Sequence, residues 1–464
     1  MAQVAQSSVK IESPFNCRRP PLGQRKFVSP SVEHTIQAVA STIADRELAW
    51  LFTNCFPNTL DTTVNFSVDS RDKPDTFIIT GDIEAMWLRE STNQVWPYLC
   101  ILNEDPHLRD MFRGLINRQA ACVRLDPHAN AFLRDWNAFS KWQHDHTEMR
   151  RGVYERKYEL DSLCSVLRLA THYYFQTNDT SCFDEPWLKS IELILQTIRR
   201  EQAGSDEWTE NSHYLFQRTT PFGGDTLNNQ GRGNPIRRTG MSRSPFRPSD
   251  DATTFQFLIP SNAMAVVCLR DLSRLLHKTG LSSRLADDAA RLAEEIDAAI
   301  ARHALIHHPI HGPIYAYEVD GYGSASLMDD ANIPSLLALP YIGYCDIADS
   351  AYQSTRAFVL GPSNPFFCRG ESAEGICSPH IGAGWIWPMS IAIRALTSDR
   401  EPEILSCLKM LKQCHGGTGF MHESFWKNDP ARFTRPWFAW ANSVFGELIL
   451  SLHRKNPSLL AEPL

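Results

Sequence analysis

The chain has 464 residues, of which 43% are hydrophobic and 21% charged, a composition typical of a folded protein with a large core. Its formal net charge of −7 does not suggest a surface for nucleic acid. No run of about 18 apolar residues predicts a membrane span, and the first residues lack the apolar core of a secretory signal. We therefore expect a cytoplasmic protein whose 12 cysteines are reduced.

The chain begins with a segment that shows no periodicity. Residues 1–30 are rich in Pro, Ser and Arg, and we expect them to be loosely ordered. Residues 31–464 are expected to form a single domain, because no linker or repeat divides them. Apolar residues at helical spacing predict a helix over 32–56. Alternating residues over 63–80 then predict two short strands around a turn at 71–74.

The stretch 80–99 combines charge, a tryptophan and an apolar helical pattern. The pattern predicts a helix from about Glu84 to Asn103 with acidic residues at its N-terminal end. In one interpretation this is a capped amphipathic helix, with Asp82 at the cap and Arg89 as a surface ion-pair partner. In another, Trp87 and its charged neighbours bind a sugar, since rings stack on C–H faces while hydroxyls bond to charged groups. The residues alone leave both interpretations open.

Helical spacing recurs along the rest of the chain. It predicts helices over 106–123, 156–177, 184–202, 260–280, 283–303, 333–339, 348–360, 384–397, 401–414 and 436–454. The longest irregular stretch is 207–250, and loops of that length are commonly functional. About twelve helices in one undivided chain predict an all-α fold, a double ring with apolar inner and amphipathic outer helices. The functional site is expected where the long polar loops meet at one end.

Four later clusters join acids or histidine to aromatic residues at loop–helix junctions. They are PSDDATTFQFLIPSN (248–262), MDDAN (328–332), SPHIGAGWIWP (378–388) and GTGFMHESFWKNDPARFTRPWFAWAN (417–442). Cleavage of a glycosidic bond needs two carboxyl groups, one to protonate the leaving oxygen and one to activate water or attack. Asp250 or Asp251 together with Glu423 is a reasonable pair, because each lies in a loop flanked by Gly or Pro with rings nearby.

Each of these residues also has a purely structural interpretation. Asp250 and Asp251 are well placed to cap the following helix. Glu423 has Lys427 one turn further on as an ion-pair partner. A histidine such as His380 is more often structural than catalytic.

Other chemistries fit the sequence less well. It contains no HExxH, no paired CxxC, no phosphate-binding GxxxxGK[ST] and no GxSxG nucleophile motif. His307, His308 and His311 lack carboxylate partners at metal-ligand spacing. The segment DDANI (329–333) lacks the last acid of the DDxxD motif found in terpene synthases. No metal or other cofactor is therefore expected.

Several motifs, in this order, resemble those of glycoside hydrolase family 125, the metal-independent exo-acting α-1,6-mannosidases. They are TGDIEAMWLRES (80–91), KYELDSL (157–163), FRPSDDA (246–252), IPSN (259–262), MDDANIPSLLALPY (328–341), HIGAGWIWP (380–388) and TGFMHESF (418–425). The resemblance covers most of residues 30–450 and implies an (α/α)6 barrel with a pocket at one end. It implies inverting release of single mannose units from the non-reducing ends of α-mannoside oligosaccharides or glycans.

The resemblance also implies residue roles. The family's acid lies in the RPSDD motif and its base in the HES motif, which here are Asp250, with Asp251 as the alternative, and Glu423. Asp250, kept protonated by an apolar or acidic neighbourhood, would donate to the departing oxygen, and ionised Glu423 would deprotonate the attacking water. An inverting pair stands roughly 6.5–9.5 Å apart to admit that water. The implied sugar-binding residues are Asp82, Trp87, Arg89, Glu90, Asp161, Asp251, Asn262, Asp329, Asp330, His380 and His422.

Two other functions remain open from the sequence. One is another helical-barrel carbohydrate enzyme, either a glucoamylase-like hydrolase or a phosphorylase. A phosphorylase would need a cationic phosphate pocket, which Arg237, Arg238 and Arg243 could supply. The other is a non-catalytic sugar-binding protein on the same scaffold, which would lack one of the two acids, whereas both are present here.

Overall fold

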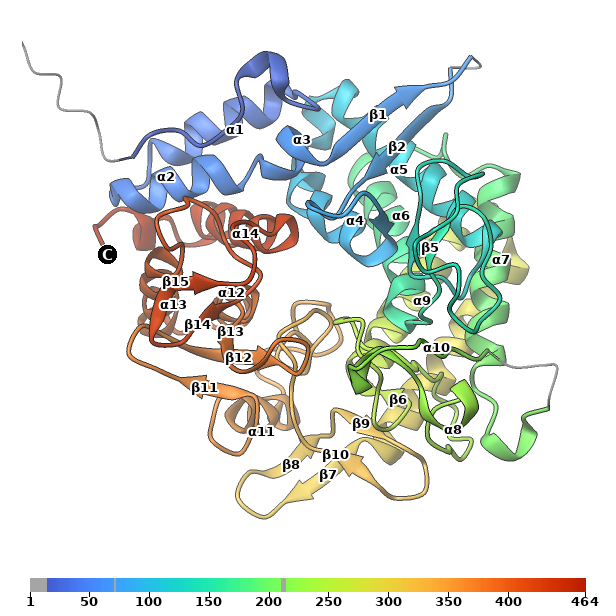
Figure 1. Ribbon diagram of the computed structural model, residues 1–464. Coiled ribbons are helices and arrows are strands. Elements are labelled where there is room, and N and C mark those ends of the chain that lie inside the picture. Colours follow the sequence, from blue (N-terminus) through green and yellow to red (C-terminus); the bar gives the residue numbers. More distant parts are fainter. Residues whose placement is uncertain (1–14, 71, 210–213) are drawn as a thin grey trace, which may run out of the picture.

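The computed structural model describes residues 15–70, 72–209 and 214–464. Its helices form a double ring, and the C-terminal helix α14 lies beside the N-terminal helix α2 (Figure 1). The inner helices are α4 (Leu88–Val95), α6 (Leu160–Thr177), α9 (Ile259–Thr279), α12 (Pro388–Leu396) and α14 (Ala439–Lys455). Helix α4 packs on α6, α6 on α9, α12 on α14, and α14 on α4. The predicted all-α (α/α)6 fold is confirmed.

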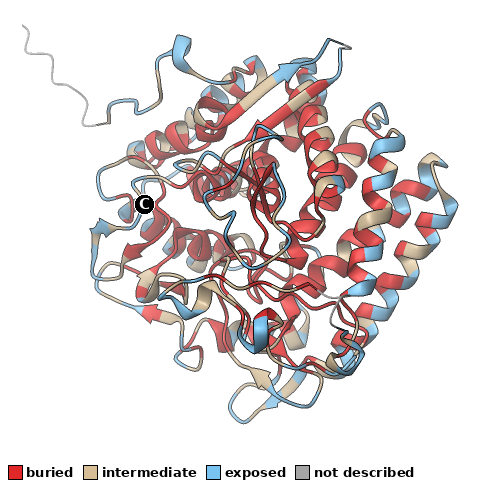
Figure 2. Cartoon of the chain, turned by 45° about the vertical axis from the view of Figure 1, so that its right-hand side comes forward, coloured by how far each residue is buried: buried red, intermediate tan, exposed pale blue. Residues whose placement is uncertain are grey.

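The outer helices cover this inner ring. They are α2 (Arg46–Cys55), α5 (Pro106–Leu125), α7 (Glu185–Arg200), α10 (Ser283–His303), α11 (Ser350–Val359) and α13 (Glu401–Gln413). Every residue of α6 from Leu160 to Thr171 is buried, whereas α10 buries a single stripe. That stripe is Leu285, Ala289, Leu292, Ile296 and Ile300. Figure 2 shows the same contrast, with exposed residues on the outward sides of peripheral helices.

An irregular segment takes the place of a predicted helix over 333–339. Residues 333–344 form bends and turns, and Tyr341 contacts two inner helices, donating to Glu447 of α14 (2.7 Å) and lying under Arg168 of α6. The predicted helix is wrong because a side chain from before this segment takes up its backbone donors. The backbone N–H groups of Leu336 and Leu337 donate instead to the carboxylate of Asp329.

Other helix boundaries also differ from the prediction: α6, expected from 156, begins at Leu160, and α14, expected from 436, begins at Ala439. The helix over 32–56 is split into α1 (Pro30–Ala40) and α2, where Asp45 accepts two backbone N–H groups as the new cap. The helix expected from Glu84 begins only at Leu88, so Asp82 is not its cap. The helix expected over 384–397 begins at Pro388. In the last two cases a short strand occupies the residues before the helix.

Short strands connect the helices. The predicted hairpin over 63–80 is confirmed as β1 (Val64–Val68) and β2 (Pro74–Ile78), with Val64 opposite Ile78. One three-stranded sheet has the order β3 (Met86–Trp87), β4 (Ala131–Phe132), β5 (Val153–Glu155). Another has the order β10 (Ala325–Ser326), β9 (Glu318–Val319), β6 (Phe257–Leu258). A further hairpin joins β7 (Leu305–His308) to β8 (Gly312–Tyr315).

The largest sheet joins two distant parts of the chain. Its order is β11 (Phe367–Arg369), β12 (Glu374–Ser378), β13 (Gly382–Ile386), β14 (Phe425–Trp426), β15 (Asp429–Phe433). Strands β3, β6 and β13 directly precede the inner helices α4, α9 and α12. The strands therefore fix the segments that lead into the ring.

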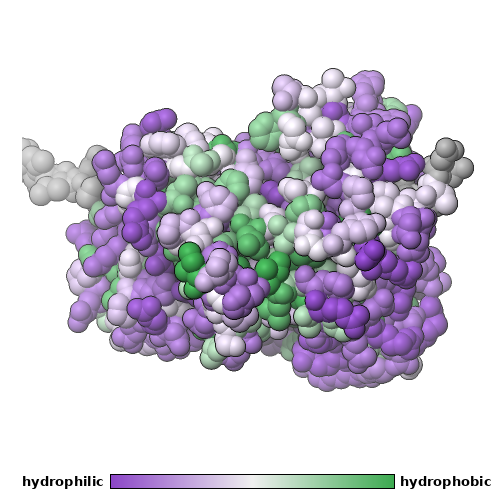
Figure 3. All heavy atoms as spheres, turned by 90° about the horizontal axis from the view of Figure 1, so that it is seen from below, coloured by the Kyte–Doolittle hydropathy of each residue, from purple (hydrophilic) through white to green (hydrophobic). Residues whose placement is uncertain are grey.

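Part of the N-terminal segment predicted to be loosely ordered, residues 1–14, lies outside the described residues. From Phe15 the chain lies against the first helices: Trp50 donates to the backbone oxygen of Asn16 (2.8 Å), and Arg19 pairs with Asp61 (2.7 Å). The remaining short helices are α3 (Asn58–Thr62) and α8 (Asn228–Gly231). None of the described helices is long and apolar enough to cross a membrane. Figure 3 shows one mostly hydrophilic face with apolar side chains near its middle.

Candidate active site

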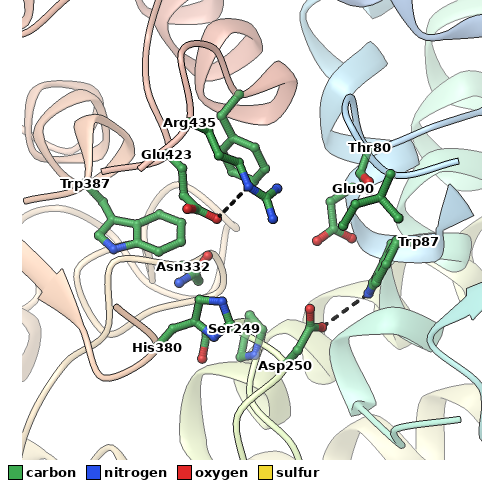
Figure 4. A pocket seen from close by; sticks show the side chains of 13 residues that line it. Thr80, Trp87, Glu90, Ser249, Asp250, Asn332, His380, Trp387, Glu423 and Arg435 are labelled. Atoms are coloured by element: carbon green, nitrogen blue, oxygen red, sulfur yellow. Dashed lines mark hydrogen bonds and ion pairs between the residues drawn. The ribbon is translucent and has the colours of Figure 1, made fainter. Parts of the chain in front are cut away.

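One pocket, of about 410 Å³, draws its lining from segments spread along the whole chain. The lining residues are Thr80, Ile83, Trp87, Glu90, Pro248, Ser249, Asp250, Asn332, His380, Trp387, Glu423, Arg435 and Phe438 (Figure 4). Three of them sit at helix starts: Trp87, Trp387 and Phe438 are the extended N-cap residues of α4, α12 and α14. The pocket therefore lies at the N-terminal ends of inner helices, where the sequence predicts a functional site.

Asp250 stands on a tight backbone turn. Its N–H donates to the oxygen of Arg247 (2.9 Å), and the N–H of Arg247 donates back to the oxygen of Asp251 (2.8 Å). Asp250 has a φ of 65°, in the left-handed region that non-glycine residues rarely adopt. Its backbone oxygen accepts a hydrogen bond from Lys157 Nζ (2.8 Å). Backbone strain of this kind tends to occur at functional sites, because the surroundings must enforce it.

The side chain of Asp250 is held by three donors that converge on Oδ1. They are Arg89 Nη2 (3.1 Å), Trp87 Nε1 (3.3 Å) and Asn130 Nδ2 (3.3 Å). Burial alone would raise the pKa of Asp250, but Arg89, a hydrogen bond shared with Glu159, and further cations lower it to about 2. The expectation that its neighbourhood keeps Asp250 itself protonated is therefore wrong.

Arg89 forms the centre of a buried cluster of four carboxyl groups. Its guanidinium contacts Glu159, Asp161 (3.1 Å), Glu90 (3.0 Å) and Asp250 (3.1 Å), and its side chain is 1% exposed. One cation cannot balance four carboxylates away from water, so burial raises the pKa of Glu90 to about 7 and that of Glu159 well above its usual range. The pKa values of Asp250, Glu90 and Glu159 are therefore shifted in opposite directions within one cluster.

Glu423 lies on the opposite side of the pocket from Asp250 (Figure 4). Its Oε2 accepts a hydrogen bond from Thr434 Oγ1 (2.8 Å), and its Oε1 lies 3.5 Å from Arg435 Nε. The sharp turn through β14 and β15 brings Thr434 and Arg435 back against Glu423. These partners, and not the alternative partner Lys427, hold the carboxylate of Glu423 in place.

His380 adds a positive charge to the pocket. Its Nδ1 lies 3.0 Å from Oδ1 of Asp251, which is buried and is not itself part of the pocket lining. Burial alone would lower the pKa of His380, but Asp251, with Asp250 and Glu423, raises it to about 9. The imidazole is therefore protonated at neutral pH, with Asp251 as its hydrogen-bonded partner.

Five of the predicted residues line the pocket together. They are Trp87, Glu90, Asp250, His380 and Glu423. Two further predicted residues lie directly behind them: Arg89 under Asp250 and Glu90, and Asp161 under Arg89, where it also accepts from Ser261 (3.1 Å).

The other predicted residues have structural contacts outside the lining. Asn262 bonds the backbone of Ser242 and Leu258, and Asp329 accepts from backbone N–H groups. Asp330 accepts from Asn332 Nδ2 (2.9 Å) and so fixes a lining residue. The remaining two both contact the segment around Arg435. Asp82 is 3.4 Å from Arg435 Nη1, and His422 stacks on Phe433 while its Nδ1 faces the Arg435 oxygen (2.9 Å).

Eight lining residues were not predicted from the sequence. They are Thr80, Ile83, Pro248, Ser249, Asn332, Trp387, Arg435 and Phe438. Most lie within one or two residues of a predicted residue, so the motifs that contain the predicted residues also pointed to these positions. Arg435 is different, because its place opposite Asp82 and beside Glu423 depends on the turn through β14 and β15.

No group of three or more His, Cys, Asp or Glu side chains in the described part of the chain is arranged to hold a metal ion. Residues 45–450 match the family described as metal-independent α-mannosidase (GH125). A metal-independent α-mannosidase from Streptococcus pneumoniae, solved in a non-productive complex with α-1,6-mannobiose, is 42% identical with a TM-score of 0.87. The match covers 92% of this chain and 99% of that one.

Two other similarities complete the comparison. The meiotically up-regulated gene 157 protein of Schizosaccharomyces pombe is 43% identical over 97% of this chain and 90% of its own length. A bacterial glucoamylase complexed with acarbose shares the fold at 11% identity and a TM-score of 0.56, over 91% of this chain and 59% of its own. The family match and the two relatives above 40% identity span the pocket and its helices. The chain is a glycoside hydrolase and belongs to family 125, the metal-independent α-mannosidases.

Proposed function

We propose that the protein is an exo-acting α-mannosidase that removes mannose from non-reducing α-1,6-linked ends with inversion, using Asp250 as general acid and Glu423 as general base. The observation that carries this proposal is the placement of the two carboxyl groups on opposite sides of one pocket (Figure 4). Inversion requires that arrangement, because the water must attack from the face opposite the leaving oxygen. The α-1,6 linkage is supported by the mannobiose bound to the S. pneumoniae relative.

The shape of the pocket supports action at chain ends. Its lining comes from segments around the whole ring, from Thr80 to Phe438, so the walls enclose a sugar on several sides. A chain end can enter such a pocket, whereas an internal sugar would need an open groove. Trp87, Trp387 and Phe438 offer ring faces for the C–H groups of the sugar, and the charged residues offer partners for its hydroxyls.

The reaction needs one proton donor and one proton acceptor. Asp250 donates a proton to the glycosidic oxygen as the bond from that oxygen to the anomeric carbon breaks and the oxygen keeps the electron pair. Glu423 accepts a proton from the attacking water, whose oxygen bonds the anomeric carbon. The contacts of Glu423 with Thr434 and Arg435 hold its carboxylate at the pocket wall, within reach of an attacking water.

The contacts of the two neighbouring aspartates support Asp250 over Asp251 as the acid. Asp250 lines the pocket, whereas Asp251 is turned toward His380 and bonded to it. The phosphorylase alternative gains no support, because the basic group at 237–243 is not part of the pocket. Arg238 pairs with Glu207, and Arg243 pairs with the buried Glu201.

The proposal is tested with Asp250→Asn and Glu423→Gln on mannobioses of each linkage, with and without a chelator. Each variant should lose at least about 10³-fold in kcat on α-1,6-mannobiose while its melting temperature stays near that of the wild type. Asp320→Asn, in a turn outside the pocket, is the control and should keep wild-type activity. NMR of the first product should show β-mannose; α-mannose first would contradict inversion, and a preference for another linkage would contradict the substrate.

A further inference from the structure

Glu159 and Asp250 share two partners beneath the pocket. Arg89 contacts both carboxyl groups, and Asn130 Nδ2 lies 3.2 Å from Glu159 Oε1 and 3.3 Å from Asp250 Oδ1. The side chain of Glu159 is fully buried, and that of Asp250 is 25% exposed toward the pocket. One carboxyl group therefore faces the sugar site, and the other lies directly behind it.

We propose that Glu159 is the positioning residue that stores the proton donated by Asp250, so that the two carboxyl groups act as a pair that shares one proton. This inference rests on the proposed role of Asp250 as the general acid. It explains how a carboxyl group bonded to Arg89 can serve as an acid at neutral pH.

The charges around Glu159 favour a proton on this pair. Arg89 of α4 is the cation that contacts it, and the acids facing it are Asp161 of α6 and Asp250. Its neutral partners are Asn130 and the hydroxyl of Ser162 (2.9 Å). Glu90 also pairs with the guanidinium of Arg89, while the positive charges of Lys157 and His380 lower the pKa of Asp250. Burial raises the pKa of Glu159 and the cations lower that of Asp250, so the resting proton lies on Glu159.

The proton moves within the pair and then into the proposed hydrolysis. Glu159 passes its proton to Asp250, and Asp250 passes it to the glycosidic oxygen as that bond breaks. Glu423 gains a proton from the attacking water and later releases it to solvent, and the pair regains one proton from solvent. Two carboxyl groups that share one proton are a known device for keeping an acid available near neutral pH.

The test compares two substrates that differ in their need for a proton. Release of mannose from α-1,6-mannobiose needs acid assistance, whereas fluoride leaves α-mannosyl fluoride without a proton. Glu159→Gln should lower kcat on mannobiose by about 10- to 100-fold and leave kcat on the fluoride within about 2-fold, since general acid catalysis is worth 10²–10⁴-fold. Loss of structure alone would lower both rates together.

Two matched variants separate the proton from the geometry. Glu155→Gln removes a carboxyl group that also accepts from Asn130 Nδ2 (3.1 Å) but has no contact with Arg89, and it should leave the ratio of the two rates unchanged. Glu159→Asp restores an ionisable group and should recover part of the mannobiose rate. It also keeps the test valid if Glu159→Gln does not fold.

The pH profile is the second readout. In Glu159→Gln the proton must reside on Asp250 alone, beside Arg89 and Lys157, so the alkaline limb of kcat/KM on mannobiose should move to lower pH. An unchanged limb, or equal losses on both substrates, overturns the role of Glu159. If Asp250→Asn also loses activity equally on both substrates, the proposed function of Asp250 fails as well, so the two failures are distinguishable.

Discussion

Replacing Asp251 by Asn should lower the pKa of His380 and destabilise the protein in a pH-dependent way. The carboxylate of Asp251 is the partner of His380 at 3.0 Å, and His380 also lies near the two proposed catalytic carboxyl groups, Asp250 and Glu423. Without that negative charge, burial and the loss of the ion pair favour the neutral imidazole. Asn keeps a similar shape, so the change removes charge with little change in packing.

The size of the effect follows from the pKa. His380 titrates near 6.5 in an unfolded chain and at about 9 in the folded protein, and each pKa unit is worth about 1.4 kcal/mol. The full value is therefore about 3.4 kcal/mol, which we reduce to rather less than half, about 1.5 kcal/mol, because the imidazole is 34% exposed, solvent screens the pair, and Asp250 and Glu423 supply part of the shift. Since the folded pKa is the higher one, this stability is complete below about pH 6.5 and is lost as the pH rises through about 9.

Denaturant unfolding at pH 6 and pH 10 measures the prediction, and NMR titration of the His380 ring measures its cause. At pH 6, Asp251→Asn should lower the free energy of unfolding by about 1.5 kcal/mol, and the difference from wild type should shrink at pH 10. Asp271→Asn, which removes a carboxylate 3.5 Å from His172 outside the pocket, should leave the His380 titration unchanged. The reasoning is refuted if the loss is equal at both pH values or if His380 still titrates near 9.

Three further predictions concern stability. Gly384→Ala should lower the free energy of unfolding by about 2–4 kcal/mol in denaturant unfolding, because its Cβ would lie 2.4 Å from the ring of Trp426 at a φ of +89°. Gly382→Ala has the same kind of φ, +108°, but no neighbour within 4 Å, so it should cost only the backbone term, about 1–2 kcal/mol. Arg89→Met should lower the free energy of unfolding by about 3–5 kcal/mol, and with it the melting temperature, because the buried carboxylates lose their cation. A loss under about 1 kcal/mol would contradict the proposed charge balance of the cluster. Phe445→Ala in α14 should cost about 3–5 kcal/mol in denaturant unfolding, and a marginal loss would mean that α14 is not part of the core.

The sequence was most informative where structure depends on local periodicity. The general expectation that inner helices are buried on most faces and outer helices are amphipathic agrees with α6, buried from Leu160 to Thr171, and with α10, which buries one stripe. The prediction over 333–339 was wrong because the deciding contact, from Asp329 to the N–H groups of Leu336 and Leu337, comes from outside the helical window. The pairing of Trp385 with Trp426 joins strands from distant segments, and no local pattern predicts it.

For the site, residue chemistry predicted several of the residues that meet in the pocket, but not how deeply each one lies. Trp87, His380 and Glu423 line the pocket as expected. Arg89 was expected to touch sugar, but it lies beneath Asp250, where its positive charge lowers the pKa of the predicted acid. Burial and neighbouring charge are properties of the folded ring, so the protonation state of Asp250 was not predictable from sequence.

Because α14 closes the ring, it also determines when the pocket can be completed during synthesis. Arg435 and Phe438 immediately precede α14, and Trp440 within it lies over the guanidinium of Arg89 (5.8 Å). Helix α14 packs against α2, α3 and α4. Because the ribosome adds residues in order, those helices are made roughly 350 residues before α14. A nascent chain on the ribosome therefore leaves the carboxyl cluster around Arg89 uncovered until α14 emerges. The pocket cannot be complete before that helix has been made.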